Sequence, residues 1–483
     1  SMRPGNRPKI DDIVEELGTL ASQARQWSPG DRNRIKVLSS APLVWTDRDG
    51  NINPITSSLD FAVERDLLTQ CISESKREIE LSFDPATDDR FLAATTSRCG
   101  CLHFSGHGSP NYLLLEDGIG GAHFLGGDDL YDRVHKEPFQ FVFVSACYSA
   151  LMGNALVKAG VPHVVCCDHN EELRDDAALK FAHSFYFALA EEYTIQAAFD
   201  KGKQAVAKRF GRFEEGKFLL LPKNADHKKP LFNAEINEWD DCDHREKYIP
   251  TPPSFFVGRE TDMYLLLQAL ISKQFVTLTG VKGVGCSSLA AAVCHYIDER
   301  RTTILGIQEV YFIRADRGQN ASTLDSFIRP LQKQLVAEGK MSSLEERSKP
   351  LSSVCEDIRV ALKGTRVLVA FDGADARDKT LSDAINGLIK MSSTIKLLIT
   401  AQSTIDSPTI YAHEHVVRLG PLDAESSALL FGEFCPHTDT PHKRQVLRTK
   451  LVRETTEGSS LHQRSFLGKI GGRLPLNIIN AAK

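Results

Sequence analysis

The chain has 483 residues, of which 42% are hydrophobic, and a formal net charge of −5. This length exceeds one ordinary domain and predicts two or three, each with enough apolar residues for its own core. Basic and acidic residues are interspersed without a basic stripe, so charge gives no argument for nucleic acid or a membrane as the main partner.

Eleven cysteines are scattered along the chain without CxxC pairs or Cys/His ligand spacing. This pattern argues against a disulfide framework and a structural zinc, so we expect reduced thiols and no metal site. No apolar run approaches the roughly 18 residues of a spanning helix, and the start lacks the pattern of a signal peptide. We therefore expect a cytoplasmic protein. Ser1-Met2 resembles a tag-cleavage remnant, and the final helical pattern has no stop signal, so we also expect a fragment of a longer protein.

The first half of the chain opens with apolar residues at helical spacing, which predict an amphipathic helix within residues 1–34. Strand-like and helical patterns then alternate, which predicts a mainly parallel sheet covered by helices over residues 35–235. The strand-like runs are 35–45, 78–83, 102–104, 162–167 and 218–221, and the helical ones are 59–72, 90–96, 151–159 and two more through Tyr193 and Phe210.

Two of these runs end on side chains that can do chemistry. One reads His-Phe-Ser-Gly-His107-Gly108, and the other reads Phe-Val-Phe-Val-Ser145-Ala-Cys147. A Cys–His protease needs a thiolate and an imidazole that exchanges its proton, and two strand ends at one sheet edge can hold them face to face. An isolated histidine or cysteine at a strand end is usually structural, but the paired strand context favours catalysis here. Cys166, Cys167 and His103 sit in apolar runs without an obvious partner, and we assign them no chemistry.

These segments resemble the CHAT branch of the caspase-like cysteine proteases. The resemblance spans residues 35–222 and includes the flanks 112–118, 156–164 and 175–178. It implies a caspase-like αβα sandwich with Cys147 as nucleophile and His107 as general acid and base. It also implies an oxyanion hole formed by the N–H groups of Gly108 and Cys147. Proteolysis of this kind requires no cofactor.

The sequence indicates less about which residues form the substrate pocket. Clan members that cut after basic residues often carry Asp two positions before the cysteine, where this chain has Ser145. Asp168, Asp175 and Asp176 stay open as pocket acids, although Asp175 and Asp176 also suit a role in capping the following helix.

The second half begins after a charged, then proline-stiffened stretch that predicts a linker at 236–253. A strand at 275–279, a glycine loop at 280–285 and a helix at 287–300 have the order of a phosphate-binding P-loop. The segments 256–260, 367–375, 396–400, 419–423 and 472–476 complete a resemblance to the STAND class of signal-transducing NTPases over 254–483.

This second resemblance implies a P-loop NTPase α/β domain at 254–415 and a small helical subdomain at 416–483. ATP or ADP would be bound there by Gly258, Arg259, Gly280, Gly283, Gly285, Cys286, Ser287, Asp372 and Pro475. Relatives carry Lys where Cys286 stands and Arg where Gln402 stands. Both cations stabilise phosphate charge, so we expect no appreciable ATP hydrolysis, and both weak nucleotide binding and an empty scaffold stay open. The role of magnesium stays open with them.

The sequence thus predicts a cysteine endopeptidase restrained or switched by a degenerate nucleotide-binding domain, in a signalling or defence pathway. Its expected partners are a protein substrate and either an activating protein or further copies of itself. Two alternatives are a catalytically silent adaptor and a nucleotide-dependent oligomerising switch. The intact dyad of His107 and Cys147 disfavours the first, and Cys286 disfavours the second.

Overall fold

The computed structural model describes residues 29–56, 61–168, 173–234, 249–301, 306–315, 322–341, 349–405, 411–438, 440–456 and 473–482. Two compact units divide the chain near residue 243, and the short segment Thr46–Thr56 is grouped with the second. The expected N-terminal helix lies outside the described residues up to position 28, and the expected linker lies outside them up to position 248.

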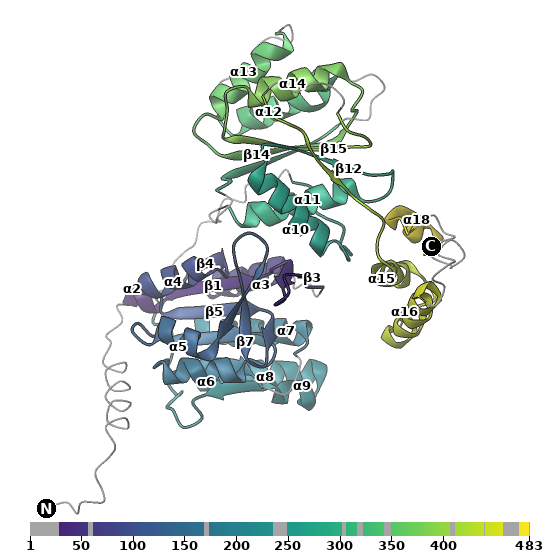
Figure 1. Ribbon diagram of the computed structural model, residues 1–483. Helices are drawn as coiled ribbons and strands as arrows, with labels where there is room; N and C mark the ends of the chain where they lie inside the picture. Colours follow the sequence, from purple (N-terminus) through teal and green to yellow (C-terminus); the bar gives the residue numbers. More distant parts are fainter. Residues whose placement is uncertain are drawn as a thin grey trace, which may run out of the picture. The chain divides into compact units, whose positions relative to one another are not determined.

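The first unit is built on a six-stranded sheet in the order β11-β10-β9-β5-β1-β4 (Figure 1). Neighbouring strands are parallel, except that β11 runs antiparallel to β10. The central strands are buried along their whole length, which explains their continuous apolar runs. The strands are β1 (Arg34–Ser40), β4 (Glu80–Pro85), β5 (Cys101–Gly106), β9 (Phe141–Ser145), β10 (Val164–Cys167) and β11 (Phe218–Leu221).

Helices cover both faces of this sheet, which makes three layers. The rings of Phe181 in α7 and Phe218 in β11 stack with their centroids 4.1 Å apart. Gly202 lets α8 approach the Phe181 ring closely. A Cβ at Gly202 would lie 2.8 Å from the Phe181 ring. One face carries α3 (Phe61–Ser75), α7 (Asp175–Ala190) and α8 (Ile195–Phe210), and the other carries α4 (Asp88–Thr96), α5 (Gly127–Val134) and α6 (Ala150–Lys158).

Several short elements complete this unit. The expected strand over 35–45 is in fact interrupted after Ser40, where Pro42 cannot donate a ladder hydrogen bond, and it resumes as β2 (Val44–Thr46), which pairs with β3 (Ile52–Pro54). A three-stranded antiparallel sheet that the sequence did not predict follows His107. It consists of β6 (Gly108–Ser109), β7 (Tyr112–Glu116) and β8 (Ala122–Gly126); the remaining helices are α2 (Pro29–Arg32) and α9 (Arg212–Gly216).

The second unit holds an all-parallel five-stranded sheet in the order β13-β14-β15-β12-β16. Helices α10 (Glu260–Ser272) and α11 (Cys286–Glu299) cover one face, and the others cover the opposite face (Figure 1). The strands are β12 (Phe275–Thr279), β13 (Glu309–Arg314), β14 (Val367–Ala374), β15 (Ile395–Ala401) and β16 (His415–Arg418); the opposite helices are η1 (Leu324–Ile328), α12 (Arg329–Ala337), α13 (Leu351–Ala361) and α14 (Lys379–Ile389).

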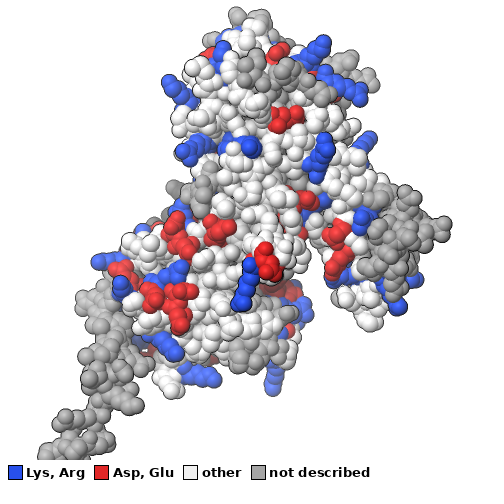
Figure 2. Space-filling view, in the orientation of Figure 1, with Lys and Arg blue, Asp and Glu red and all other residues white. Residues whose placement is uncertain are grey.

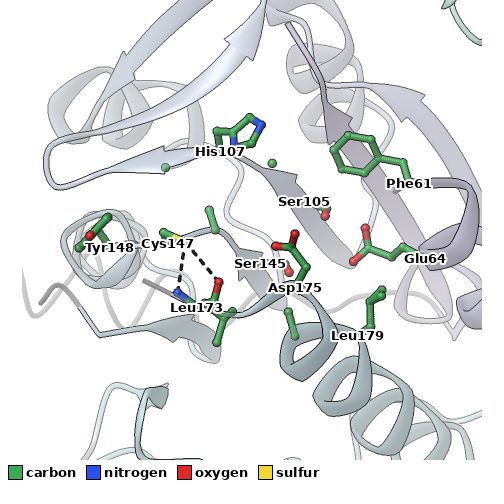
Figure 3. A pocket seen from close by; sticks show the side chains of 14 residues that line it. Phe61, Glu64, Ser105, His107, Ser145, Cys147, Tyr148, Leu173, Asp175 and Leu179 are labelled. Carbon is green, nitrogen blue, oxygen red and sulfur yellow. Dashed lines mark hydrogen bonds between the residues drawn. The ribbon is translucent and has the colours of Figure 1, made fainter. Parts of the chain in front are cut away.

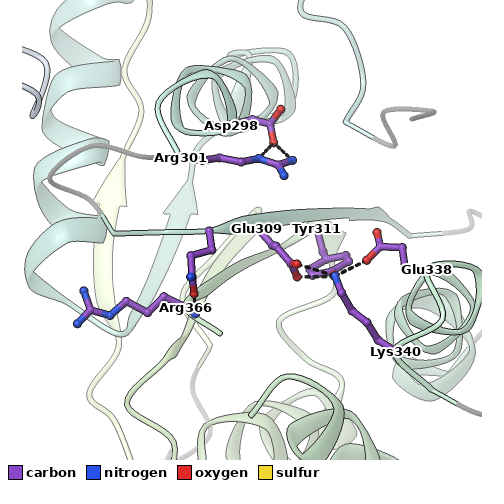
Figure 4. Close-up of polar contacts among 8 residues, drawn as sticks. Asp298, Arg301, Glu309, Tyr311, Glu338, Lys340 and Arg366 are labelled. Carbon is purple, nitrogen blue, oxygen red and sulfur yellow. Dashed lines mark hydrogen bonds and ion pairs between the residues drawn. The ribbon is translucent and has the colours of Figure 1, made fainter. Parts of the chain in front are cut away.

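A polar cluster ties the end of α12 to the start of β13 (Figure 4). Lys340 Nζ lies 2.7 Å from the hydroxyl of Tyr311 and 2.7 Å from Glu309 Oε1. The same ammonium also pairs with Glu338, whose carboxylate accepts a hydrogen bond from Tyr311. One ammonium thus joins two carboxylates and a tyrosine hydroxyl, so we interpret the cluster as a structural tie.

A small helical subdomain closes the described chain. The carboxylate of Asp423 accepts a hydrogen bond from the N–H of Ser426 at 2.8 Å, so Asp423 caps its first helix. Its helices are α15 (Ala424–Phe434), α16 (Pro441–Thr456) and α18 (Pro475–Ala482), and they share an apolar core. The expected α/β fold class, a helix-covered αβα sandwich followed by a P-loop-type α/β unit with helices, is confirmed.

Two surface properties agree with the composition. Within the described ranges, no helix combines the length and apolar character that a bilayer crossing needs. Basic and acidic side chains are interspersed on the face shown in Figure 2.

Candidate active site

The strand register brings His107 and Cys147 to the same edge of the first sheet. Strands β5 and β9 are parallel neighbours, and Ser105 pairs with Ser145 at their ends. His107 and Cys147 each follow two residues later, so the two chains leave the sheet side by side. Both residues are half-buried and line one cavity.

Gly108 makes the approach of these two segments possible. A Cβ at this position would lie 2.2 Å from the carbonyl oxygen of Cys147 and 3.2 Å from the Cβ of Ala146. Real Cβ atoms do not come closer than 3.0 Å to other atoms, so only glycine fits here without displacing the backbone. The residue after the histidine therefore rests directly against the backbone of the cysteine.

The turn after β9 presents the cysteine before a helix begins. Tyr148 has a φ of 56°, a left-handed conformation that is uncommon for a bulky residue and marks a tight turn. Ser149 stabilises the turn, because its buried hydroxyl accepts a hydrogen bond from the N–H of Cys167 at 2.9 Å. Helix α6 starts at Ala150, so Cys147 lies just before a helix N-terminus, where the macrodipole favours a thiolate.

A backbone contact that the sequence did not reveal also acts on the thiol. The N–H of Leu173 points at Cys147 Sγ from 3.3 Å, and the carbonyl of Leu173 lies 3.8 Å from the same sulfur (Figure 3). An N–H donor stabilises the anionic form of a sulfur. No local pattern near Cys147 could have indicated this contact, because Leu173 is 26 residues away.

Most other thiols of the chain are poor nucleophiles. Burial raises the pKa of Cys286 to about 11 and that of Cys71, Cys166 and Cys355 to about 12. Because the thiolate is the reactive form, these groups react slowly near neutral pH. Burial also raises the pKa of Cys99, Cys101, Cys167 and Cys294.

The cavity that His107 and Cys147 line has a volume of about 370 Å³. Besides the two reactive residues, its wall includes Ser145, as the sequence predicts, together with Ser105 and Phe61. Figure 3 shows side chains from α3, the ends of β5 and β9, and the start of α7 facing one another around it.

Two carboxyl groups line the same cavity. Glu64 is buried, and Nε2 of His103 lies 3.2 Å from its Oε1, while Nδ1 of His103 contacts the hydroxyl of Tyr186 at 2.9 Å. Burial acts to raise the pKa of Glu64, but hydrogen bonds from His103 and Ser105 outweigh it and the pKa is lowered. His103 thus has two partners, contrary to the sequence interpretation, and they lie 39 and 83 residues away in the chain.

Asp175 is the second carboxyl group of the cavity. It occupies the first turn of α7 and lines the cavity wall. Burial raises the pKa of this group, and the neighbouring His107 opposes the shift. Asp175 therefore lies on the wall of the cavity that His107 and Cys147 also line.

The P-loop of the second unit has its expected backbone. Gly283 and Gly285 have φ values of 88° and 104°, and Gly285 precedes the first residue of α11. Cys286 starts the helix in place of the lysine, and a Cβ on Gly280 would lie 3.1 Å from its sulfur. Ser287 follows in the first turn. The loop shape is kept, and the phosphate-binding ammonium is absent from position 286.

The neighbouring residues of this loop are engaged in structural contacts. Arg259 is buried, donates to the carbonyl of Val284 at 2.9 Å and pairs with Asp262 at 2.7 Å. Gly258 packs against the side chain of Ser426 in α15. The sequence pair Gly258-Arg259 thus braces the loop and the helical subdomain in this structure.

Asp372 and the start of α18 are likewise occupied. Asp372 is buried, accepts the hydroxyl of Thr400 at 2.7 Å and lies 3.0 Å from Nε of Arg314, a partner that sequence reasoning missed. Pro475 begins α18, and the N–H of the next residue, Leu476, donates to the carbonyl of Gly283 at 3.3 Å. Gln402, at the expected sensor-arginine position, is exposed just beyond β15.

The family model of the CHAT domain matches residues 20–213. The matched residues make up most of the first unit and include His107 and Cys147. No curated protein matches the chain.

Solved structures resemble parts of the chain at low identity. A STAND protein with a tetratricopeptide repeat sensor from Pyrococcus horikoshii is 17% identical over 43% of this chain, with a TM-score of 0.29, and this chain spans 29% of its length. A Walker-type ATPase of Pyrococcus abyssi is 17% identical over 49% of this chain and 69% of its own, with a TM-score of 0.32. The ORC2 protein of Aeropyrum pernix is 12% identical over 49% and 70%, with a TM-score of 0.28.

Within the first unit, two of the expected pocket acids lie away from the cavity wall. Asp176 is exposed and forms a two-point ion pair with Arg174, at 3.0 and 2.9 Å. Asp168 follows β10, and its N–H donates to the carbonyl of Lys217 at 2.8 Å. Among the three aspartates that the sequence leaves open, the cavity wall contains Asp175.

Proposed function

We propose that this chain is a cysteine endopeptidase that uses Cys147 as nucleophile and His107 as general acid and base. The observation that carries the proposal is the shared cavity at the ends of β5 and β9, which both side chains line. The CHAT match over the same residues supports it, because it covers both positions.

The chemistry follows from the positions of these groups. Cys147 Sγ, as thiolate, attacks the carbonyl carbon of the scissile peptide, and the C–N bond breaks as His107 protonates the departing amine. Water then attacks the thioester while His107 takes its proton, and the carboxylic acid leaves with Cys147 restored. The N–H groups of Gly108 and Cys147 are our candidates for holding the oxyanion.

An electrophilic peptide probe tests this function. We expect covalent labelling at Cys147 that is lost in Cys147→Ala and in His107→Ala, with both variants folded by circular dichroism. Cys435→Ala is the matched control, because Cys435 is also a half-buried free thiol and lies in the helical subdomain. Labelling of Cys147→Ala at the wild-type level would end the protease assignment.

For the second unit we propose a regulatory role without appreciable ATP turnover, with ATP or ADP as its ligand if the loop binds nucleotide. Cys286 replaces the P-loop ammonium, and Arg314 already neutralises Asp372. Each lost cation costs phosphoryl transfer orders of magnitude in rate. Cleavage at a protease site inserted between positions 236 and 248 should raise peptidase activity if this unit restrains the CHAT domain, and unchanged activity would refute restraint.

A further inference from the structure

The cavity beside the reactive pair carries negative charge without a built-in cation. Asp175 and Glu64 both line it, while no lysine or arginine is present among the described residues of its wall. Figure 3 shows the carboxyl groups of both acids on the same side of the cavity, with Ser105 between them. Glu64 is held by hydrogen bonds with His103 and Ser105, whereas Asp175 comes from the start of α7 on the same wall.

The shape of the cavity limits what it can accept. Its volume of about 370 Å³ lies at the low end of the roughly 300–1,000 Å³ found for small-molecule sites. Such a space suits one long side chain. Phe61 and Leu179 supply apolar wall for a methylene stem, and the carboxylates of Asp175 and Glu64 lie on the same wall.

The position of the cavity identifies which substrate residue enters it. Cys147 and His107 lie on its wall, so a side chain inside belongs to the residue whose carbonyl carbon is next to the sulfur. That is the residue on the N-terminal side of the cleaved bond. Position 145 is serine, so the charge at this point of the site comes from α7 and α3 instead of from β9.

We propose, building on the cysteine peptidase function above, that Asp175 selects substrates with lysine or arginine on the N-terminal side of the scissile bond, with Glu64 adding negative charge at the back of the pocket. The ion pair forms as the peptide covers the opening and excludes water, which strengthens it relative to an exposed pair. Asp175 acts on specificity and takes no part in proton transfer.

A matched peptide series tests the proposal with the full chain. Peptides differing only in arginine, lysine, citrulline or norleucine at that position are compared for wild type, Asp175→Asn and Asp176→Asn. Citrulline keeps the shape of arginine without its charge. We expect wild type to favour arginine over citrulline by roughly 10- to 100-fold in kcat/KM, the range for truncating one partner of a partly desolvated charge pair. Asp175→Asn should collapse this ratio toward one, and Asp176→Asn should keep it.

Three results would overturn the proposal. Equal cleavage of the arginine and citrulline peptides by wild type would show that the pocket does not read charge. An unchanged ratio in Asp175→Asn would remove Asp175 from recognition. An equal loss on all peptides in Asp175→Asn, with a shifted pH profile, would make Asp175 a positioning residue for His107.

A second measurement works even if the chain is held inactive. Small cationic, neutral and anionic methanethiosulfonate reagents modify Cys147 at rates that report the local charge. Wild type and Asp176→Asn should prefer the cationic reagent, and Asp175→Asn should lose roughly tenfold of that preference, a factor that equals about 1.4 kcal/mol. Equal preference in Asp175→Asn and wild type would contradict the proposal. By contrast, failure of Cys147 to react with any peptide probe, together with no hydrolysis, would refute the peptidase function itself.

Discussion

Gly108 offers the sharpest structural test of how the reactive pair is assembled. In Gly108→Ala, the new Cβ would start 2.2 Å from the carbonyl oxygen of Cys147, against a practical minimum of 3.0 Å. The two segments must therefore separate by roughly 1 Å, and a misplacement of that size can cost about 10²-fold in rate. Overpacking of this kind also costs about 1–3 kcal/mol of folding free energy.

The assay is the rate at which an electrophilic peptide probe labels Cys147, measured well below the melting transition of each variant. Gly127→Ala is the control, because its Cβ would lie 3.5 Å from the Met152 side chain, an ordinary contact. We expect Gly108→Ala to label about 10²-fold more slowly than wild type and Gly127→Ala to match wild type. Wild-type labelling of a folded Gly108→Ala would refute the argument that this contact sets the geometry of the pair.

Two further predictions concern stability and the nucleotide loop. Nδ1 of His163 lies 2.8 Å from Nδ1 of His227, and burial lowers the pKa of His163 to about 4, below its ordinary 6.5. The unfolded chain therefore binds a proton that the buried His163 of the folded chain does not bind. The free energy of unfolding should consequently fall by up to about 3 kcal/mol as the pH drops from about 6.5 to 4. Urea unfolding of His163→Asn should show a shallower pH slope than wild type, and equal slopes would contradict this. In the second unit, steady phosphate release should not exceed that of Ser287→Ala, and Cys286→Lys should tighten nucleotide binding by calorimetry; clear turnover by wild type, or no gain in the lysine variant, would contradict an open but degenerate loop.

The sequence predicted the scaffold of the site because its signals are local. Apolar runs of strand length ending at Ser105 and Ser145 define where two strands stop, and parallel pairing then carries the next residues to one edge. The P-loop is equally local, since strand, glycines and helix follow one another directly. These elements could be placed without knowing which segments touch.

The contacts that tune the site could not be predicted, because their partners are distant in the chain. Leu173 reaches the sulfur from 26 residues away, and Glu64 reaches His103 from 39. Asp175 and Asp176 are adjacent and chemically identical, and helix phase alone decides that Asp175 lines the cavity while Asp176 pairs with Arg174. A shift of one residue in the start of α7 would exchange them, and sequence patterns do not fix helix ends that closely.

The dependence of Cys147 reactivity on His107 tests the central claim most directly. The rate of alkylation by a small neutral reagent at pH 7 is mapped by mass spectrometry at Cys147, with Cys435 as the internal reference. An imidazole that holds the thiolate beside it increases this rate, so His107→Ala should slow Cys147 by roughly tenfold or more and leave Cys435 unchanged. If Cys147 reacts at the same rate in wild type and His107→Ala, the two residues do not act as a pair and the account is wrong.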